Sequence, residues 1–151
     1  MIKIQGRVKL VCYDGKGELK WRTRWIKNGI CNAGKAQMAL LAGDASATPF
    51  TYLEVGTSVT AFGASQTALQ AAITDSGLAR AAATVSRVTT TVTNDTLNLT
   101  TTWNVTGSKT IEEIGIFNAS SSGTMLGRAL TGTKTVANLD VFVAIYQVKM
   151  S

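Results

Sequence analysis

Hydrophobic and polar residues alternate along the first twelve positions of the chain, which is typical of a β-strand with one buried face. Tyr13 to Gly17 then supplies an Asp-Gly turn, and a second alternation runs from Leu19 to Trp25. Residues 2–27 therefore predict an antiparallel β-hairpin. It must pack on the rest of the domain or on a partner, because an isolated hairpin is only marginally stable. The hairpin carries the candidate partner-binding residues Arg7, Lys9, Lys20, Trp21, Arg22, Arg24 and Trp25.

The pattern changes to helical spacing after residue 32. Residues 33–42 predict a short helix with Asn32 as its N-cap and Gly43 just past its end. A strand is expected over 50–56, followed by a Gly/Ala/Ser-rich loop. The apolar spacing of residues 66–73 predicts a second short helix with Ser65 as its cap.

The second half of the chain is β-like throughout. Residues 78–93 and 96–106 predict a long hairpin around an Asn-Asp turn, and further strands are expected over 111–118, 125–130 and 139–150. The last strand is apolar on both faces, so it belongs in the middle of a sandwich or at an interface. The count is about eight strands and two short helices. It predicts a mainly β fold: one domain over 1–151, built as an antiparallel β-sandwich over 28–151 with the N-terminal hairpin 2–27.

The amino-acid composition argues against a membrane-spanning or secreted protein. Of the 151 residues, 45% are hydrophobic and 16% are charged, and no apolar run approaches the roughly 20 residues that span a bilayer. The first six residues lack the apolar core of a signal peptide. We therefore expect a soluble protein with no membrane partner.

The types of residue present exclude most catalytic mechanisms. The chain has no histidine, which excludes Ser-His-Asp and Cys-His catalysis and histidine metal sites. Cys12 and Cys31 are either buried thiols or a disulfide pair, and their spacing fits no metal or redox motif. The carboxylates are dispersed, and the adjacent Glu112 and Glu113 point to opposite faces of a strand. We expect no catalytic residues, no metal, no cofactor and no small-molecule substrate.

Positive charge is concentrated at the N-terminus. Residues 1–35 hold nine Lys/Arg and two acids, a balance of +7, whereas residues 36–151 hold six and seven, a balance of −1. This asymmetry indicates attraction to an acidic protein surface or a nucleic acid, or simply the solvated face of a sheet. Trp21 and Trp25 could stack on sugars or bases, but alternation places them opposite the basic side chains, which favours a packing role.

Several segments together resemble a known family. They are the run Asn28 to Gly34 with the helix that follows it, Phe50 to Thr57, Thr67 to Leu69, the arginine-bearing segments 78–81 and 85–88, and Ile111 to Asn118. Over roughly residues 28–148 the chain resembles small virion structural proteins of tailed bacteriophages, of the capsid-decoration and tail-collar types. The hairpin 2–27 lies outside the shared pattern.

The resemblance implies a non-enzymatic β-sandwich protein located in the virion and assembled in the bacterial cytoplasm. The first expectation is a capsid decoration or cement protein, a homo-oligomer bound to the major capsid protein or to other virion proteins. The alternatives are a tail, collar or baseplate component and a glycan- or receptor-binding module using Trp21, Trp25 and Tyr52. A nucleic-acid binder using the basic hairpin ranks below these.

Overall fold

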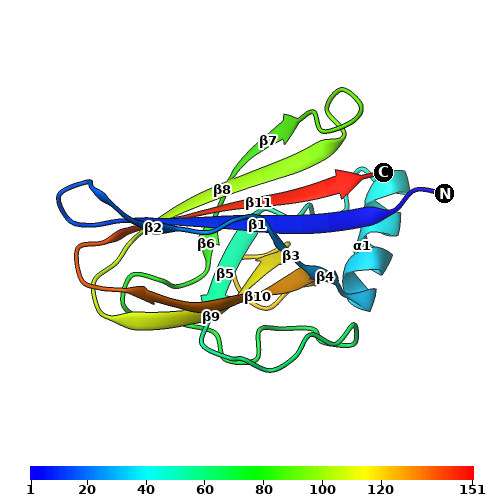
Figure 1. Ribbon diagram of the computed structural model, residues 1–151. Coiled ribbons are helices and arrows are strands. Elements are labelled where there is room, and N and C mark those ends of the chain that lie inside the picture. The colour runs from blue at the N-terminus through cyan, green and yellow to red at the C-terminus, as the bar shows by residue number, and fades with distance from the viewer.

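Two antiparallel sheets face each other in the computed structural model, which describes residues 1–151 (Figure 1). The first has the order β2-β1-β11-β8-β7, with β3 also beside β1, and the second has the order β4-β10-β9-β5-β6. The strands are β1 (Ile4–Tyr13), β2 (Leu19–Arg22), β3 (Ile26–Lys27), β4 (Gly29–Ile30), β5 (Tyr52–Gly56), β6 (Ala81–Ala82), β7 (Thr84–Val88), β8 (Thr96–Asn104), β9 (Lys109–Phe117), β10 (Met125–Val136) and β11 (Val141–Met150). This arrangement confirms the predicted mainly β sandwich.

The centre of the six-stranded sheet joins the two ends of the chain. All ten residues of β1 pair with β11, from Ile4 opposite Met150 to Tyr13 opposite Val141. The opposite side of β11 pairs with β8. The N-terminal hairpin is therefore part of the sandwich, and β11 is a central strand, as its apolar pattern predicted.

Alternation along these strands builds the core. Inward-facing side chains of β1, β8 and β11 meet those of β5, β9 and β10 in one cluster of 21 buried residues. On β11 the inward residues Phe142, Ala144 and Tyr146 are completely buried, whereas Val143 and Ile145 on the other face are half-buried.

The predicted hairpin over 78–106 is correct only in part. β7 pairs with β8, with Thr84 opposite Thr100, but the connection is a longer turn over residues 89–95 in place of the expected Asn-Asp turn, so the predicted strand is wrong over 89–93. The residues before β7 belong to the other sheet. Ala81 and Ala82 form β6 and pair with β5. The chain thus changes sheets at Ala83.

The helix predicted over 33–42 is present as α1 (Asn32–Gly43), which packs on β10 near both chain ends (Figure 1). Its capping differs from the prediction. The N-cap residue is Cys31, with no side-chain cap, and Gly43 lies within the helix. A Cβ at Gly34 would lie 2.5 Å from the carbonyl oxygen of Leu126, so this glycine permits the close approach of helix and strand.

The second helix, predicted over 66–73, is wrong. The segment is irregular and extended, and Ala72 makes an isolated bridge with Gly56. Its backbone donors are satisfied elsewhere: the amides of Gln70 and Ala71 donate to the carboxylate of Glu113. Tertiary hydrogen bonds have replaced those of a helix.

The strand count also exceeds the prediction, because the two-residue strands β3, β4 and β6 carry no alternation of their own. β10 continues through the loop expected after Leu130. It does so with a register shift between Leu130 and Lys134, where Gly132 adopts a positive φ of 66°.

Candidate binding face

The outward-facing side chains of the six-stranded sheet are mostly half-buried or exposed, and the 89–95 turn contacts them only at the end near Thr96 and Lys149. The strand pairings show which residues belong to this face. Arg7 lies opposite Gln147 on β11 and Lys27 on β3, and Val11 lies opposite Val143 on β11 and Arg22 on β2. Antiparallel partners project to the same side of a sheet, so these residues share one surface. We call this surface the outer basic face.

An apolar strip runs along the middle of the outer basic face. It is formed by Val11 on β1 and by Val141, Val143 and Ile145 on β11, all of which are half-buried. Tyr13 continues the strip at 37% exposure. The strip is the outward side of the strand that the sequence showed to be apolar on both faces.

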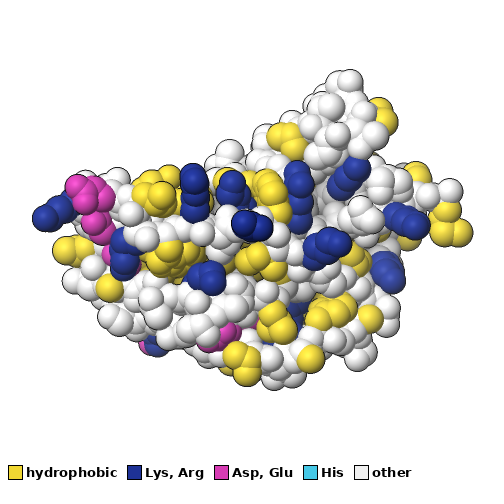
Figure 2. All heavy atoms as spheres, in the orientation of Figure 1, with side chains coloured by type: hydrophobic (Ala, Val, Ile, Leu, Met, Phe, Trp, Pro, Cys, Tyr) yellow, Lys and Arg dark blue, Asp and Glu magenta, His cyan; other side chains and the backbone are white.

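Cations without ionic partners surround this strip. The four ion pairs of the molecule use Lys20, Arg80, Lys109 and Arg128. None of the basic residues around the strip belongs to an ion pair; these are Arg7, Lys9, Arg22, Arg24, Lys27 and Lys149. In Figure 2, Lys and Arg side chains spread over this side of the molecule, and Asp and Glu gather mainly at the tip of the β1–β2 turn. The face therefore has a net positive charge that the chain itself does not neutralise.

Trp25 belongs to this charged surface. The guanidinium of Arg7 lies 4.1 Å from the centre of the Trp25 ring, and Lys9 Nζ lies 5.9 Å from it. Alternation predicted Trp25 opposite the basic side chains, and this is wrong. Regular pairing stops after Arg22, and Thr23 is instead held by hydrogen bonds with the backbone of Leu10, so the period-two phase is lost before Trp25.

Two other candidates from the hairpin contact the sandwich itself. Lys20 Nζ lies 2.5 Å from the Asp140 carboxylate. The Trp21 indole donates to the backbone oxygen of Thr135 on β10, and its ring packs 5.9 Å from that of Phe142. These contacts give Lys20 and Trp21 a role in closing one end of the sandwich. Arg22 and Arg24 are exposed, and their side chains make no hydrogen bond or ion pair within the chain.

A row of polar side chains crosses the outer basic face. Arg7 Nε donates to Gln147 Oε1 at 2.9 Å, Gln147 Nε2 donates to Asn98 Oδ1 at 3.0 Å, and Asn98 Nδ2 donates to Ser86 Oγ at 3.2 Å. Sequence reasoning missed Gln147 and the neighbouring Lys149. The alternation of β11 placed both residues on one face, but the partner strand that brings them beside Arg7 is 140 positions away.

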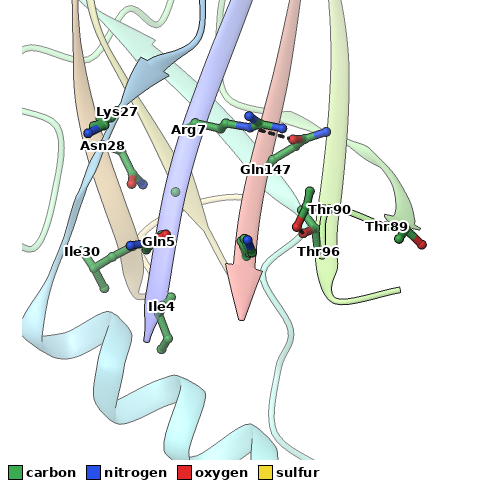
Figure 3. A pocket seen from close by; sticks show the side chains of 12 residues that line it. Ile4, Gln5, Arg7, Lys27, Asn28, Ile30, Thr89, Thr90, Thr96 and Gln147 are labelled. Atoms are coloured by element: carbon green, nitrogen blue, oxygen red, sulfur yellow. Dashed lines mark hydrogen bonds between the residues drawn. The ribbon is translucent and has the colours of Figure 1, made fainter. Parts of the chain in front are cut away.

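An open pocket of about 820 Å³ lies at the end of this row, where β1 begins and β11 ends (Figure 3). It is lined by Ile4, Gln5, Gly6, Arg7, Lys27, Asn28, Ile30, Thr89, Thr90, Thr96, Gln147 and Lys149. Figure 3 shows Arg7 and Gln147 pointing toward each other from β1 and β11. The lining contains three cations and no acidic residue.

The remaining reactive groups are held in structural roles. Cys12 and Cys31 are completely buried free thiols. Burial and the neighbouring Asp140 carboxylate raise the pKa of Cys12 to about 11, and burial raises that of Cys31, so both stay protonated at neutral pH. Burial would raise the pKa of Asp140, but hydrogen bonds from Lys20 and the Ala137 amide outweigh it and lower the pKa.

The carboxylates do not converge on a site. Glu113 is completely buried against Arg128, whereas the adjacent Glu112 is half-buried and accepts a hydrogen bond from Thr133. Nowhere do three or more Cys, Asp or Glu side chains gather as metal ligands would.

No protein-family model, curated protein or solved structure matches the chain. The only helix, α1, is too short to cross a membrane.

Proposed function

We propose that this protein is a non-enzymatic structural protein of a tailed-bacteriophage virion that decorates the capsid. In this proposal the outer basic face docks on an acidic surface of the major capsid protein. One observation carries it: an uncovered apolar strip is surrounded by six cations that have no ionic partner within the chain.

The composition of the face fits a protein partner. Protein interfaces combine an apolar centre with a polar, charged rim, and the strip of Val11, Val141, Val143 and Ile145 with its surrounding cations has this arrangement. A partner of opposite charge is favoured. Two copies of the chain meeting through this same face would place like charges against each other, which costs several kcal/mol in such interfaces.

A nucleic acid fits the face less well. Proteins that bind single strands offer open aromatic rings on which bases stack. The Trp25 ring already carries the Arg7 guanidinium at 4.1 Å, and a phosphate backbone would gain nothing from the apolar strip. The capsid as partner comes from the resemblance of residues 28–148 to phage virion proteins.

Attachment to isolated phage heads and tails tests the proposal. The informative variant replaces Arg7, Lys9, Arg22 and Arg24 with serine. A control removes the same charge elsewhere by replacing Lys16, Lys35, Arg87 and Lys134, which also lack ion pairs, with serine. We expect the first variant to lose attachment to heads and the control to keep it.

Attachment of the native protein should also weaken as salt rises from about 50 mM to 500 mM, because screening shortens the Debye length to a few ångströms. Attachment to tails alone would assign the protein to the tail or baseplate. Steeply salt-dependent binding to duplex DNA with no attachment to heads would replace the proposal with a nucleic-acid function.

A further inference from the structure

Arg7 lines the pocket at the end of the outer basic face, and two neighbouring side chains hold it there. Its Nε donates to Gln147 Oε1, and its guanidinium carbon lies 4.1 Å from the centre of the Trp25 ring. The two terminal nitrogens, Nη1 and Nη2, make no hydrogen bond within the chain, and Arg7 is one of the residues that line the open pocket.

The side chains around Arg7 hold it in this orientation. Gln147 is only 9% exposed, and its amide is fixed in turn by Asn98, which donates to Ser86. An arginine held by a stacking ring and a fixed acceptor loses little side-chain entropy when a ligand binds. The unused Nη1–Nη2 edge matches the two oxygens of a carboxylate.

We propose that Arg7 is the anchor of this face and binds, through Nη1 and Nη2, the carboxylate of an Asp or Glu side chain from an acidic segment of the partner. Lys27 and Lys149, which line the same pocket, provide charge for further acidic groups of that segment. This inference rests on the proposed function and adds the chemical group that the face recognises.

The surroundings favour an acidic peptide over a phosphate backbone. The pocket opens next to the apolar strip that begins at Ile145, so a bound segment can place apolar side chains there while its carboxylate reaches Arg7. Hydroxyl groups of Thr89 and Thr90 also line the pocket, and Lys149 Nζ is held by a hydrogen bond to Thr91.

Two charge-conserving variants test the role of Arg7. Arg7→Lys keeps the positive charge but removes the bidentate edge of the guanidinium, whereas Arg87→Lys makes the same change at an exposed position outside the outer basic face. The probe is a hexaglutamate peptide, and its affinity is measured by titration calorimetry. We expect Arg7→Lys to weaken binding about tenfold and Arg87→Lys to change it less than about twofold.

A spectroscopic readout separates binding at Arg7 from a general loss of charge. Titration of the peptide into labelled protein should shift the Nε–H resonance of Arg7 and the indole N–H resonance of Trp25, while the indole of Trp21 stays unchanged. Equal effects of the two lysine variants would overturn the anchor role. They would leave the proposed function intact, provided that the fourfold serine variant still fails to attach to heads.

The chemical class of the ligand has its own control. The carboxylate assignment is wrong if a duplex DNA of matched charge binds more tightly than hexaglutamate and Arg7→Lys weakens the binding of both ligands equally. In that case the site binds phosphate groups. Shifts at Arg7 with hexaglutamate that are absent with inorganic phosphate support it.

Discussion

The outer faces of the two sheets differ in how far the chain covers them and in whether their charged side chains form ion pairs. The outer face of the five-stranded sheet is covered by the segment 57–80, and its charges are paired inside the molecule. The outer face of the six-stranded sheet is contacted by another segment only at one end, by the 89–95 turn, and the cations around its apolar strip have no ionic partner. The difference indicates that charge on one face stabilises the fold, whereas charge on the other is available for binding.

The covered face depends on one buried ion pair. Arg128 and Glu113 are both fully buried, with Nε and Oε2 2.5 Å apart. Glu113 accepts the amides of Gln70 and Ala71, and Arg128 Nη1 donates to the backbone oxygen of Thr60. The pair therefore holds the covering segment on the sheet at Thr60 and at residues 70–71.

A second pair acts at the far end of the same segment. Arg80 binds the carboxylate of Glu54 through two nitrogens, at 2.8 and 3.2 Å, and its guanidinium lies 3.7 Å from the centre of the Phe117 ring. Arg80 thus resembles Arg7 in its stacked geometry but has its carboxylate already in place. On the open face, the equivalent carboxylate would come from the partner.

The largest effect is expected from breaking the buried pair. Glu113→Gln leaves the Arg128 charge buried without a counter-ion, which typically costs about 3–5 kcal/mol of unfolding free energy. Urea denaturation measures it. Glu112→Gln is the matched control, because Glu112 is half-buried and makes one hydrogen bond, and its cost should stay below about 1 kcal/mol. Equal costs at the two positions would show that the ion pair does not hold the covering segment.

The two hairpin tryptophans should separate stability from binding. Trp21→Ala removes packing on Phe142 and the hydrogen bond to Thr135, so we expect a loss of about 2–4 kcal/mol in unfolding free energy. Trp25→Ala, at 38% exposure, should cost about 1 kcal/mol or less but should weaken attachment to phage heads, because Arg7 loses its stacking surface. Denaturation and head-binding assays on both variants check this. A reversal, with Trp25 stabilising and Trp21 binding, would contradict the division.

The smallest effect concerns pH. The pKa of Asp140 is lowered in the folded protein, so its stabilising contribution is complete above the ordinary aspartate pKa of about 4 and declines as pH falls toward the folded pKa. Asp140→Asn should cost about 1 kcal/mol at pH 7 and should remove part of the acid destabilisation below pH 4. Denaturation midpoints at pH 7 and pH 3 provide the test. An unchanged pH dependence in the variant would assign the acid response to other carboxylates.

Much of the fold could be predicted from local pattern. Alternation identified the hairpin strands and β11, which is apolar on both faces, and helical spacing identified α1. These elements can be predicted because the spacing of apolar residues in the sequence matches the repeat of the strand or helix that buries them. The segment 66–73 could not be predicted in this way. Leu69 and Ile73 have helical spacing and are both buried, but the partner that decides the backbone conformation is Glu113, some forty positions later.

The candidate face shows the same limit. Sequence reasoning selected Arg7, Lys9, Arg22 and Arg24, which lie on or beside the outer basic face. It could not separate them from Lys20, whose partner Asp140 is 120 positions away. It also could not place Trp25 beside Arg7, because the irregular turn after Arg22 changes the phase of the alternation.

Thiol accessibility tests the central claim most directly, namely that the outer basic face is the docking surface. Both native cysteines are completely buried, so a single introduced cysteine is the only reactive thiol on the surface. Thr102→Cys places one beside the apolar strip, opposite Val143, and Thr67→Cys places one on the segment that covers the other sheet. On addition of phage heads, we predict that maleimide labelling slows at position 102 in proportion to the bound fraction and is unchanged at position 67. Protection at position 67 with free labelling at position 102 would contradict the account.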